Sequence, residues 1–555
     1  MFKGQPKGLF ALALANTGER FGYYTMIAIF LLFLQAKFGF SAATAGQFYA
    51  IFIAVVYFMP VLGGWLADRI GYGRCVVTGI SIMFLGYLCL AIPTQSNGFG
   101  IALMIFSLLV IALGTGLFKG NLQVMVGNLY DDPKYAAKRD SAFSLFYMAI
   151  NIGSMFAPAA ATAITNRHLA ASGFVYKADI PALAHQFSDG IISAENLDKL
   201  NGFAQSMPGG AAMDTATFCS TYLDKLAVSY NLGFGVACIS LIVSIIIYLA
   251  CRPWFKHADV TARQASASGN EAAVELTPKQ TRERIIALFM VFAVVIFFWM
   301  AFQQSGSSLT YFARDYTQSS VSGWMRLGFN IWALTLLAVS VYTLFGTFQS
   351  ETKKGKVICG AVTLALWGAT LWIYKGMDSV ITILPQEFQM FNPFFVVALT
   401  PVSIALFGAL AERGKEPSAP KKIALGMMVA ALGYLIMVLA SRGLASPKEL
   451  GGVVSDTLVS PANLMSTYLV LTFAELLLSP MGISFVTKVA PPKYKGLMMG
   501  FWFASSAIGN YLSSIPSLLW AKVPLWVNWC ILASLCAIAS LIMVTMLRRV
   551  EEASK

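Results

Sequence analysis

Long apolar segments recur along almost the whole chain of 555 residues, and no other feature limits the fold as strongly. A helix that crosses the hydrocarbon core of a bilayer needs about 20 mainly apolar residues. Hydrophobic residues make up 57% of the chain and charged residues only 12%, whereas soluble domains carry about 25% charged residues. The sequence therefore predicts an all-α polytopic membrane protein with fourteen membrane helices. They lie near residues 9–34, 45–66, 75–93, 100–126, 141–165, 228–250, 285–306, 325–347, 357–374, 388–411, 423–441, 464–486, 497–519 and 526–547.

Positive charges are distributed unevenly between the two sides of these segments. With the N-terminus placed inside, most of the 39 Lys and Arg residues fall on the cytoplasmic side, as the positive-inside rule requires. The net charge of +13 thus reflects topology, and we expect a lipid bilayer rather than a nucleic acid as the partner. Both termini are expected in the cytoplasm. The first apolar run lacks a cleavage site and is expected to be retained.

Cysteine and histidine are placed so that several kinds of chemistry are excluded. Of the eight cysteines only Cys219 falls in a long outer loop, so no disulfide framework is indicated. The three histidines, His168, His185 and His257, all fall in loops. This pattern excludes a zinc site or a histidine proton relay within the membrane. We expect neither an enzyme nor a cofactor.

Two long polar stretches divide the chain. Residues 166–227 are expected to form an outer loop, and residues 252–284 a cytoplasmic linker. The pattern G-x-L-A-(D/E)-R occurs at residues 64–69 and again at 408–413, which suggests two related halves with a site between them, as in many transporters. The predicted domains are a six-helix bundle (1–251), the linker, a second six-helix bundle (285–548) with an inserted hairpin (325–375), and a cytoplasmic tail (549–555).

Four ionisable residues lie well inside the apolar segments: Glu19, Arg20, Lys119 and Glu475. Each costs about 2.5–3.5 kcal/mol at the bilayer centre on insertion scales. They form either salt bridges that join helices or a polar cavity for a charged solute. Because desolvation offsets most of the attraction in a buried ion pair, the pattern favours the cavity.

Helical spacing arranges the polar residues of the first segment. Glu19 lies about 100° around the helix from Arg20, so we expect Glu19 to pair with Lys119 instead. Residues at i, i+4, i+7 and i+8 form one polar stripe: Asn16, Arg20, Tyr23 and Tyr24.

Further polar side chains occur in later segments, and together they fit a solute that carries both charges. Arg20 and Lys119 suit a carboxylate, whereas Glu475 suits an ammonium group. A zwitterion is the simplest solute of this kind. The other members of the set are Tyr57, Tyr147, Asn151, Asn392, Trp502 and Asn510.

Several motifs resemble the proton-dependent oligopeptide transporters, a branch of the major facilitator superfamily. The stretch GERFGYYTM (18–26) resembles the family's first-helix motif, and KRDSAFSLFYMAINIGSMFAP (138–158) resembles its fifth-helix signature. The resemblance implies a major facilitator fold that imports di- and tripeptides with protons by alternating access. It also implies a monomer in a bacterial cytoplasmic (inner) membrane. Shorter matches follow in order: GTGLFKGN, FWMAFQQSGSSL, FQMFNPFF, EPSAPKK, FAELLLSPMG and MMGFWF.

The resemblance also implies roles for individual residues. Arg20 and Lys119 would face the peptide carboxylate, with Lys119 also contributing to gating. Asp68 and Arg69 would hold the inner gate. The residues facing the amino end would be Asn151, Asn392 and Glu475, and those lining the pocket Tyr23, Tyr24, Tyr57, Tyr147 and Trp502.

Three positions depart from the family pattern. Asn16 replaces a glutamate, Gln303 replaces an acidic residue, and Ile27 replaces an arginine found in many members. In the family, the arginine and the acidic residue at positions 27 and 303 can form a gating salt bridge. Loss of one partner would leave a buried charge unpaired, so loss of both costs less free energy. Because Asn16 cannot titrate, proton coupling is expected to run through Glu19 or Glu475.

Two alternatives to proton-coupled peptide import remain open. The first is an uncoupled or differently coupled carrier of another zwitterionic or anionic solute. The second is a receptor role, for which the outer loop 166–227 is the only sizeable candidate surface. The inserted hairpin (325–375) is expected to pack at the edge of the bundle and to face lipid.

Overall fold

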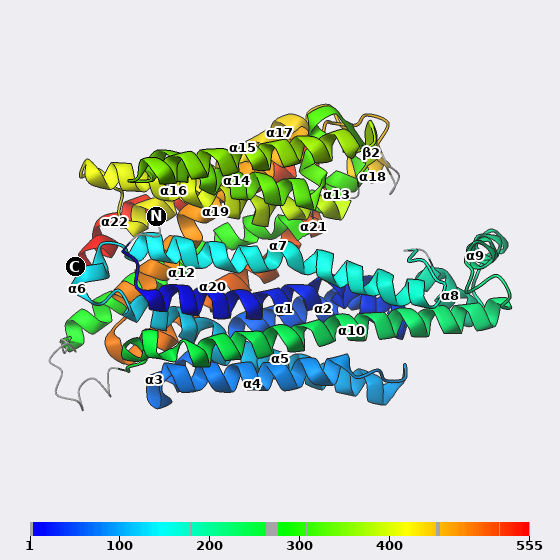
Figure 1. Ribbon diagram of the computed structural model, residues 1–555, viewed down its shortest axis with the longest axis horizontal. Coiled ribbons are helices and arrows are strands. Elements are labelled where there is room, and N and C mark those ends of the chain that lie inside the picture. Colours follow the sequence, from blue (N-terminus) through cyan, green and yellow to red (C-terminus); the bar gives the residue numbers. More distant parts are fainter. Residues whose placement is uncertain are drawn as a thin grey trace.

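The computed structural model of the protein describes residues 4–553 except 41, 178–179, 262–275, 307, 384, 451–454 and 521. Part of the expected linker and the last residues of the expected tail therefore lie outside the described residues. Within the described part the chain is almost entirely helical, as predicted. Both termini lie at the same end of the molecule (Figure 1).

In the described residues, the N-terminal half contains seven helices of the main bundle, the four-residue helix α6 and two short outer helices. Proline shapes one of its spans: Pro60 begins α3, so the apolar stretch 45–66 is divided into two helices that still form one span, Gln47–Ile70. The helices are α1 (Lys7–Phe38), α2 (Ala42–Phe58), α3 (Pro60–Ile70), α4 (Tyr72–Ala91), α5 (Gly98–Asn128), α6 (Pro133–Ala136), α7 (Arg139–Ala171), α8 (Ile180–Ser188), α9 (Ala194–Ser206) and α10 (Thr215–Ala250).

The C-terminal half begins at a capping box. The side chains of Thr277, just before the helix, and Gln280, in its first turn, each accept a hydrogen bond from the other's backbone N–H group, and Pro278 is the first helical residue. Its helices are α12 (Pro278–Phe302), α13 (Ser308–Asp315), α14 (Ile331–Gln349), α15 (Lys353–Gly376), α16 (Phe391–Glu412), α17 (Ala419–Ala440), α18 (Pro447–Leu450), α19 (Ala462–Val489), α20 (Lys495–Leu512), α21 (Ser514–Leu519) and α22 (Leu525–Ala553). Short 3₁₀ turns and two strands, β1 (Ser320–Ser322) and β2 (Val380–Thr382), connect them.

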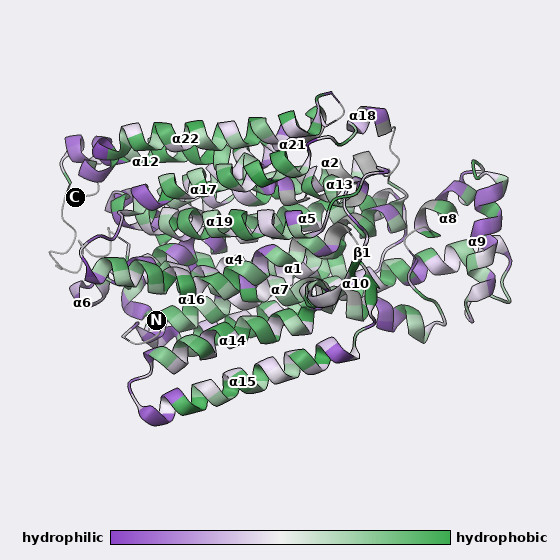
Figure 2. Ribbon diagram, turned by 90° about the horizontal axis from the view of Figure 1, so that it is seen from above, coloured by the Kyte–Doolittle hydropathy of each residue, from purple (hydrophilic) through white to green (hydrophobic). Residues whose placement is uncertain are grey.

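The number of membrane spans differs from the fourteen expected. In the described residues, eleven helices are long and apolar enough to cross a membrane, or twelve if the bent pair Lys7–Phe30 and Leu32–Phe38 is one span. The exact count of fourteen is therefore not confirmed. Hydrophobic residues dominate the middle of the long helices, and hydrophilic residues gather at their ends (Figure 2).

The outer region 166–227 is more ordered than a loop. Helix α7 continues to Ala171 and α10 begins at Thr215, so both extend beyond the apolar stretches that the sequence indicated. Between them, α8 and α9 lie beyond the other helices, at the end opposite the termini (Figure 1). Polar N-caps explain these additions, because Ser193 and Asp214 each accept a hydrogen bond from the backbone of the following turn.

The inserted hairpin consists of α14 and α15, and residues 323–329 form a 3₁₀ turn before it. Helix α15 lies along the edge of the molecule (Figure 2), with Trp372 78% exposed. Helix α14 packs against α16, and the hydroxyl of Tyr342 donates to the carbonyl of Val397 at 2.6 Å. The same hydroxyl lies 2.6 Å from the sulfur of Met148 on α7. The hairpin thus touches both halves.

The two halves approach each other closely at glycine. A methyl group on Gly64 of α3 would lie 1.9 Å from the carbonyl oxygen of Gly496 on α20. Such small residues let membrane helices pack backbone to backbone. Within the C-terminal half, Gly482 of α19 makes room for the ring of Trp502, which is buried.

Substitution of Gly482 tests this packing. In Gly482→Ala the added methyl group would lie 2.0 Å from the Trp502 ring, and overpacking of this kind costs about 1–3 kcal/mol. We expect a lower midpoint of thermal unfolding and a changed tryptophan emission. Gly368→Ala on α15 is the matched control, because its methyl group would meet nothing within 4 Å. Equal midpoints for the two variants would contradict the close contact.

Candidate functional site

Glu475 of α19 is held by side chains from both halves of the chain. The hydroxyl of Tyr147, on α7, donates to Oε1 of Glu475. The amide Nδ2 of Asn392, on α16, donates to Oε2 at 2.7 Å and to Thr472 at 3.1 Å. Glu475 is only 3% exposed. The structure thus brings three of the predicted site residues together, as a buried carboxylate with one donor from each half.

Asn151 supports this group rather than contacting the carboxylate. Its Nδ2 donates to the backbone carbonyl of Tyr147 at 3.0 Å, one turn earlier on the same helix. The Asn151 side chain is thereby fixed next to Tyr147. Its predicted contact with the amino end of a solute stays a prediction.

Glu19 and Arg20 form a buried, bidentate ion pair, which corrects the expectation that Glu19 pairs with Lys119. Arg20 Nε lies 2.5 Å from Oε2 of Glu19, and Nη2 lies 2.5 Å from Oε1. The side chains of Glu19 and Arg20 are long enough to meet although their Cβ atoms point about 100° apart around the helix. Because a buried charge is costly unless it is paired and hydrogen-bonded, the guanidinium closes back onto its neighbour.

Lys119 is held by aromatic rings instead of a carboxylate. Its ammonium lies 3.8 Å from the ring centroid of Tyr57 on α2 and 4.5 Å from that of Phe503 on α20. Among the described ion pairs none involves Lys119. Cation–π contacts of this kind stabilise a desolvated ammonium. The sequence reasoning missed Phe503, although it directly follows Trp502.

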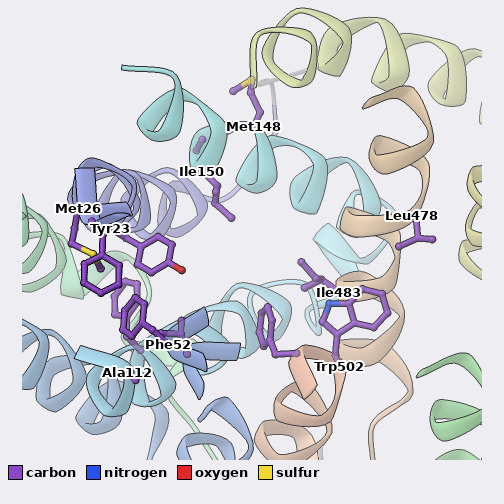
Figure 3. Packing of buried hydrophobic residues seen from close by; sticks show 14 of the residues in the cluster. Tyr23, Met26, Phe52, Ala112, Met148, Ile150, Leu478, Ile483 and Trp502 are labelled. Carbon is purple, nitrogen blue, oxygen red and sulfur yellow. The ribbon is translucent and has the colours of Figure 1, made fainter. Parts of the chain in front are cut away.

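The remaining aromatic residues divide between the two halves. Figure 3 shows Tyr23 and Ile150 on one side and Ile483 and Trp502 on the other. The Tyr23 ring lies 4.6 Å from the Arg20 guanidinium and meets Tyr24 edge to face at 5.3 Å. The hydroxyl of Tyr23 is buried, and the described residues provide no hydrogen-bond partner for it.

The three positions that depart from the family pattern differ in their surroundings. Asn16 is 3% exposed, and its Nδ2 has no hydrogen-bond partner among the described residues. Ile27 packs against the hydrophobic core. Gln303 is partly exposed, whereas its neighbour Gln304 is buried and donates to the carbonyls of Met300 and Ser513. None of these positions carries a charge.

Asp68 connects the two halves at the end of the molecule that holds both termini. Its carboxylate accepts hydrogen bonds from the backbone N–H groups of Gly496 and Leu497 at 2.8 and 3.0 Å, and from the Tyr72 hydroxyl at 2.7 Å. These N–H groups belong to the first turn of α20, where a negative charge also complements the helix dipole. Asp68 thus joins α3 to the start of α20, and its role in gating stays a prediction.

Arg69 does not act in the way that was predicted together with Asp68. Its guanidinium lies 3.8 Å from the ring centroid of Trp65, on its own helix, and the side chain is exposed. At a helix end an arginine reaches the water instead of bridging to a neighbour. Of the predicted gate pair, Asp68 alone joins two helices in the described part of the chain.

Two lysines of the C-terminal half pair with aspartates of the N-terminal half at the same end. Lys422 of α17 lies 3.3 Å from Asp140 of α7, and Lys495 of α20 lies 2.8 Å from Asp131. Ser484 of α19 also donates to Asp140 at 2.5 Å. The sequence reasoning did not single out these residues, because single charges at helix ends look like topology signals. These ion pairs join the two halves at this end of the molecule.

Removal of one charge tests the Glu19–Arg20 pair. Arg20→Gln leaves a buried carboxylate without its cation, which costs about 3–5 kcal/mol, so we expect a clear fall in the midpoint of thermal unfolding. The double variant Glu19→Gln/Arg20→Gln removes both charges and should recover most of the loss. A double variant no more stable than Arg20→Gln would show that Glu19 has another partner, such as Lys119.

Comparisons with known proteins give one consistent picture. The family model described as "POT family" matches residues 74–274 and 363–528. The peptide transporter YePEPT of Yersinia enterocolitica is 29% identical, over 93% of this chain and 88% of the relative. A di-/tripeptide transporter of Lactococcus lactis is 27% identical, over 92% of this chain and 89% of the relative.

Solved structures share the fold. A crystal structure of a mutant of the peptide transporter POT with alafosfalin has a TM-score of 0.57 and 23% identity, over 100% of this chain and 96% of that one. A POT family transporter with 5-aminolevulinic acid has a TM-score of 0.59 and 18% identity, over 99% and 98% of the two chains. These proteins are membrane transporters and not enzymes. The chain belongs to the POT family.

Proposed function

We propose that the protein imports di- and tripeptides by alternating access. The observation that carries the proposal is the carboxylate of Glu475, which is held between the halves by Tyr147 and Asn392. The cations Arg20 and Lys119 supply the opposite charge in the same half as Tyr147. The family and the names of its relatives support a peptide as the solute.

In this proposal the ammonium group of the peptide replaces a donor at Glu475. Because Tyr147 and Asn392 already satisfy the carboxylate, an incoming ammonium competes with the Tyr147 hydroxyl. Loss of that bond would loosen the contact between α7 and α19. Binding of the solute would thereby change the contact between the two halves. Alternating access requires such a link between binding and conformation.

The carboxylate of the peptide would meet the opposite end of the site. Lys119 is held only by rings, so its ammonium keeps its hydrogen-bond donors for a solute. Arg20 is already occupied by Glu19. We therefore assign the main carboxylate contact to Lys119, with Arg20 as a secondary contact.

Proton coupling is the second part of the proposal. A carboxylate in a dry site binds a proton more readily than one in water, and Glu475 is buried without a cation among the described ion pairs. Glu19, in contrast, is already paired with Arg20. We therefore favour Glu475 over Glu19 as the group that takes up the proton.

We further propose that the protein is a monomer in a bacterial inner membrane with both termini in the cytoplasm. The positive-inside pattern supports this orientation, and so do the two termini at one end of the molecule (Figure 1). The inner contacts of Asp68, Lys422 and Lys495 would then close the cytoplasmic side and would have to break during transport.

Uptake of labelled dialanine into proteoliposomes tests cargo and coupling together. We expect uptake under an inward pH gradient, competition by other dipeptides, and a large loss on addition of a protonophore. Glu475→Gln removes the proposed proton site and should abolish the response to the gradient. Glu449→Gln, an exposed residue on α18, is the matched control. Absence of uptake and of competition by other dipeptides would overturn peptide transport.

The neutral residues Asn16, Ile27 and Gln303 favour a second candidate, an uncoupled or differently coupled carrier of another zwitterionic or anionic solute. Uptake that is indifferent to a protonophore would support it. Asn16→Glu places a titratable group in a buried site next to Arg20, and we expect a steeper pH dependence of uptake. Asn16→Gln keeps the side chain neutral and serves as the control. An unchanged pH profile in Asn16→Glu would exclude this position as the source of weak coupling.

A further inference from the structure

A cavity opens between the two halves at the end of the molecule that holds both termini, and Glu475 does not line it. Its volume is about 830 Å³. Residues 130–144, which include the start of α7, provide most of the wall from the N-terminal half, and α16, α17 and α19 provide the wall from the C-terminal half. We call this cavity the inner cleft. Four of its lining residues carry the argument: Asp140, Ser144, Ser403 and Lys422.

One polar stripe of α7 connects the Glu475 site with the inner cleft. Asp140, Ser144 and Tyr147 follow one another at i, i+4 and i+7, so they lie on the same face of the helix. Asn151 continues the stripe by one more turn. Tyr147 binds Glu475, whereas Asp140 and Ser144 line the cleft. The stripe therefore runs from one site to the other.

Helix α16 provides the facing stripe. Asn392 binds Glu475, and Ser403 lines the inner cleft eleven residues later. Eleven residues make about three turns, so the two side chains share one face of α16. Helices α7 and α16 pack against each other. Two matching faces thus extend from the Glu475 site to the cleft.

The hairpin helix α14 covers this seam from the outside. Tyr342 touches Met148, which follows Tyr147, and Val397, which lies between Asn392 and Ser403. Tyr342 therefore contacts both α7 and α16, at positions along these helices near the Glu475 site and between that site and the inner cleft. A charged group that moves along the seam would be kept from lipid, where its presence is costly.

The charges of the inner cleft match a zwitterion. The carboxylate of Asp140 is paired with Lys422, and Lys422 is also bound by Glu416 at 2.6 Å. Further charges of both signs line the same cavity, so no single sign dominates. They are Asp131, Lys138, Arg139, Glu412 and Lys488.

We propose that the inner cleft is a second, release-side binding site for the transported zwitterionic peptide. Asp140 takes over the ammonium group that Glu475 gives up, and Lys422 takes the peptide carboxylate. The inference rests on the proposed function, because it assumes that a peptide first binds at Glu475. It adds a site and two residues, Asp140 and Lys422, to that function.

The spacing along α7 supports two separate binding sites rather than one extended pocket. Seven residues of α7 separate Asp140 from Tyr147, a rise of about 10 Å. A fully extended dipeptide spans only about 7 Å. The dipeptide is shorter than this rise, and its single ammonium group pairs with one of the two carboxylates at a time.

A bulky side chain in the cleft tests the proposal. Ser403 is buried and faces the cavity, so Ser403→Trp should fill the cleft and leave the Glu475 site intact. We expect dialanine to raise the unfolding temperature as in the wild type, while uptake into proteoliposomes falls about tenfold, equivalent to about 1.4 kcal/mol in the barrier. Leu406→Trp is the matched control, because Leu406 is on the same helix and 46% exposed.

Two outcomes would overturn the release site. One is normal uptake by Ser403→Trp, and the other is loss of both uptake and dialanine stabilisation. If the wild type itself neither binds nor transports dialanine, the proposed function fails instead, and the release site fails with it.

A smaller substitution covers the case in which Ser403→Trp does not fold. In Ser403→Cys, a charged thiol reagent that does not cross membranes should modify the new cysteine in inside-out vesicles, above the level set by the eight native cysteines of the wild type. Dialanine should slow this modification. Modification at the same rate with and without dialanine would contradict a peptide site in the cleft.

Discussion

A buried carboxylate shared by both halves of the chain is the constraint on which the centre of the protein depends. Desolvation of an ionised carboxylate costs several kcal/mol unless its oxygens find donors. Glu475 obtains one donor from α7 and one from α16. The Glu475 carboxylate therefore keeps both donors only while the two halves stay together, and any group that replaces a donor changes how they fit.

The other charges in the membrane must also be compensated, and each is compensated by a different kind of contact. Glu19 and Arg20 neutralise each other within one turn of α1, and Lys119 rests between the rings of Tyr57 and Phe503. Each arrangement hides a charge from lipid without an ion pair between distant helices. Ion pairs between the halves lie instead at the end of the molecule that holds both termini, where Lys422 and Lys495 meet aspartates. The aspartate side chains are 33% and 50% exposed, so water reaches one partner of each pair.

The sequence was a good guide to the helices and to the residues around Glu475, because hydrophobic length and intramembrane charge are strong signals. It was a poor guide to pairing. Side-chain direction suggested that Glu19 avoids Arg20, but two long side chains can reach back across one residue. Phe503 and the Lys422–Asp140 pair were missed, since an aromatic residue in a membrane helix and a charge at a helix end are both common. Only the packing of distant helices shows that they meet.

The self-contained Glu19–Arg20 pair has an electrical consequence. With that pair neutral, Lys119 balances Glu475 whenever both are charged, and the four ionisable groups in the middle of the membrane then sum to zero. The membrane potential, worth about 2.3 kcal/mol per elementary charge per 100 mV, then does no net work on these groups when the empty protein changes shape. A zwitterionic cargo adds no charge either. Any current that accompanies transport would be carried by the co-transported ion alone.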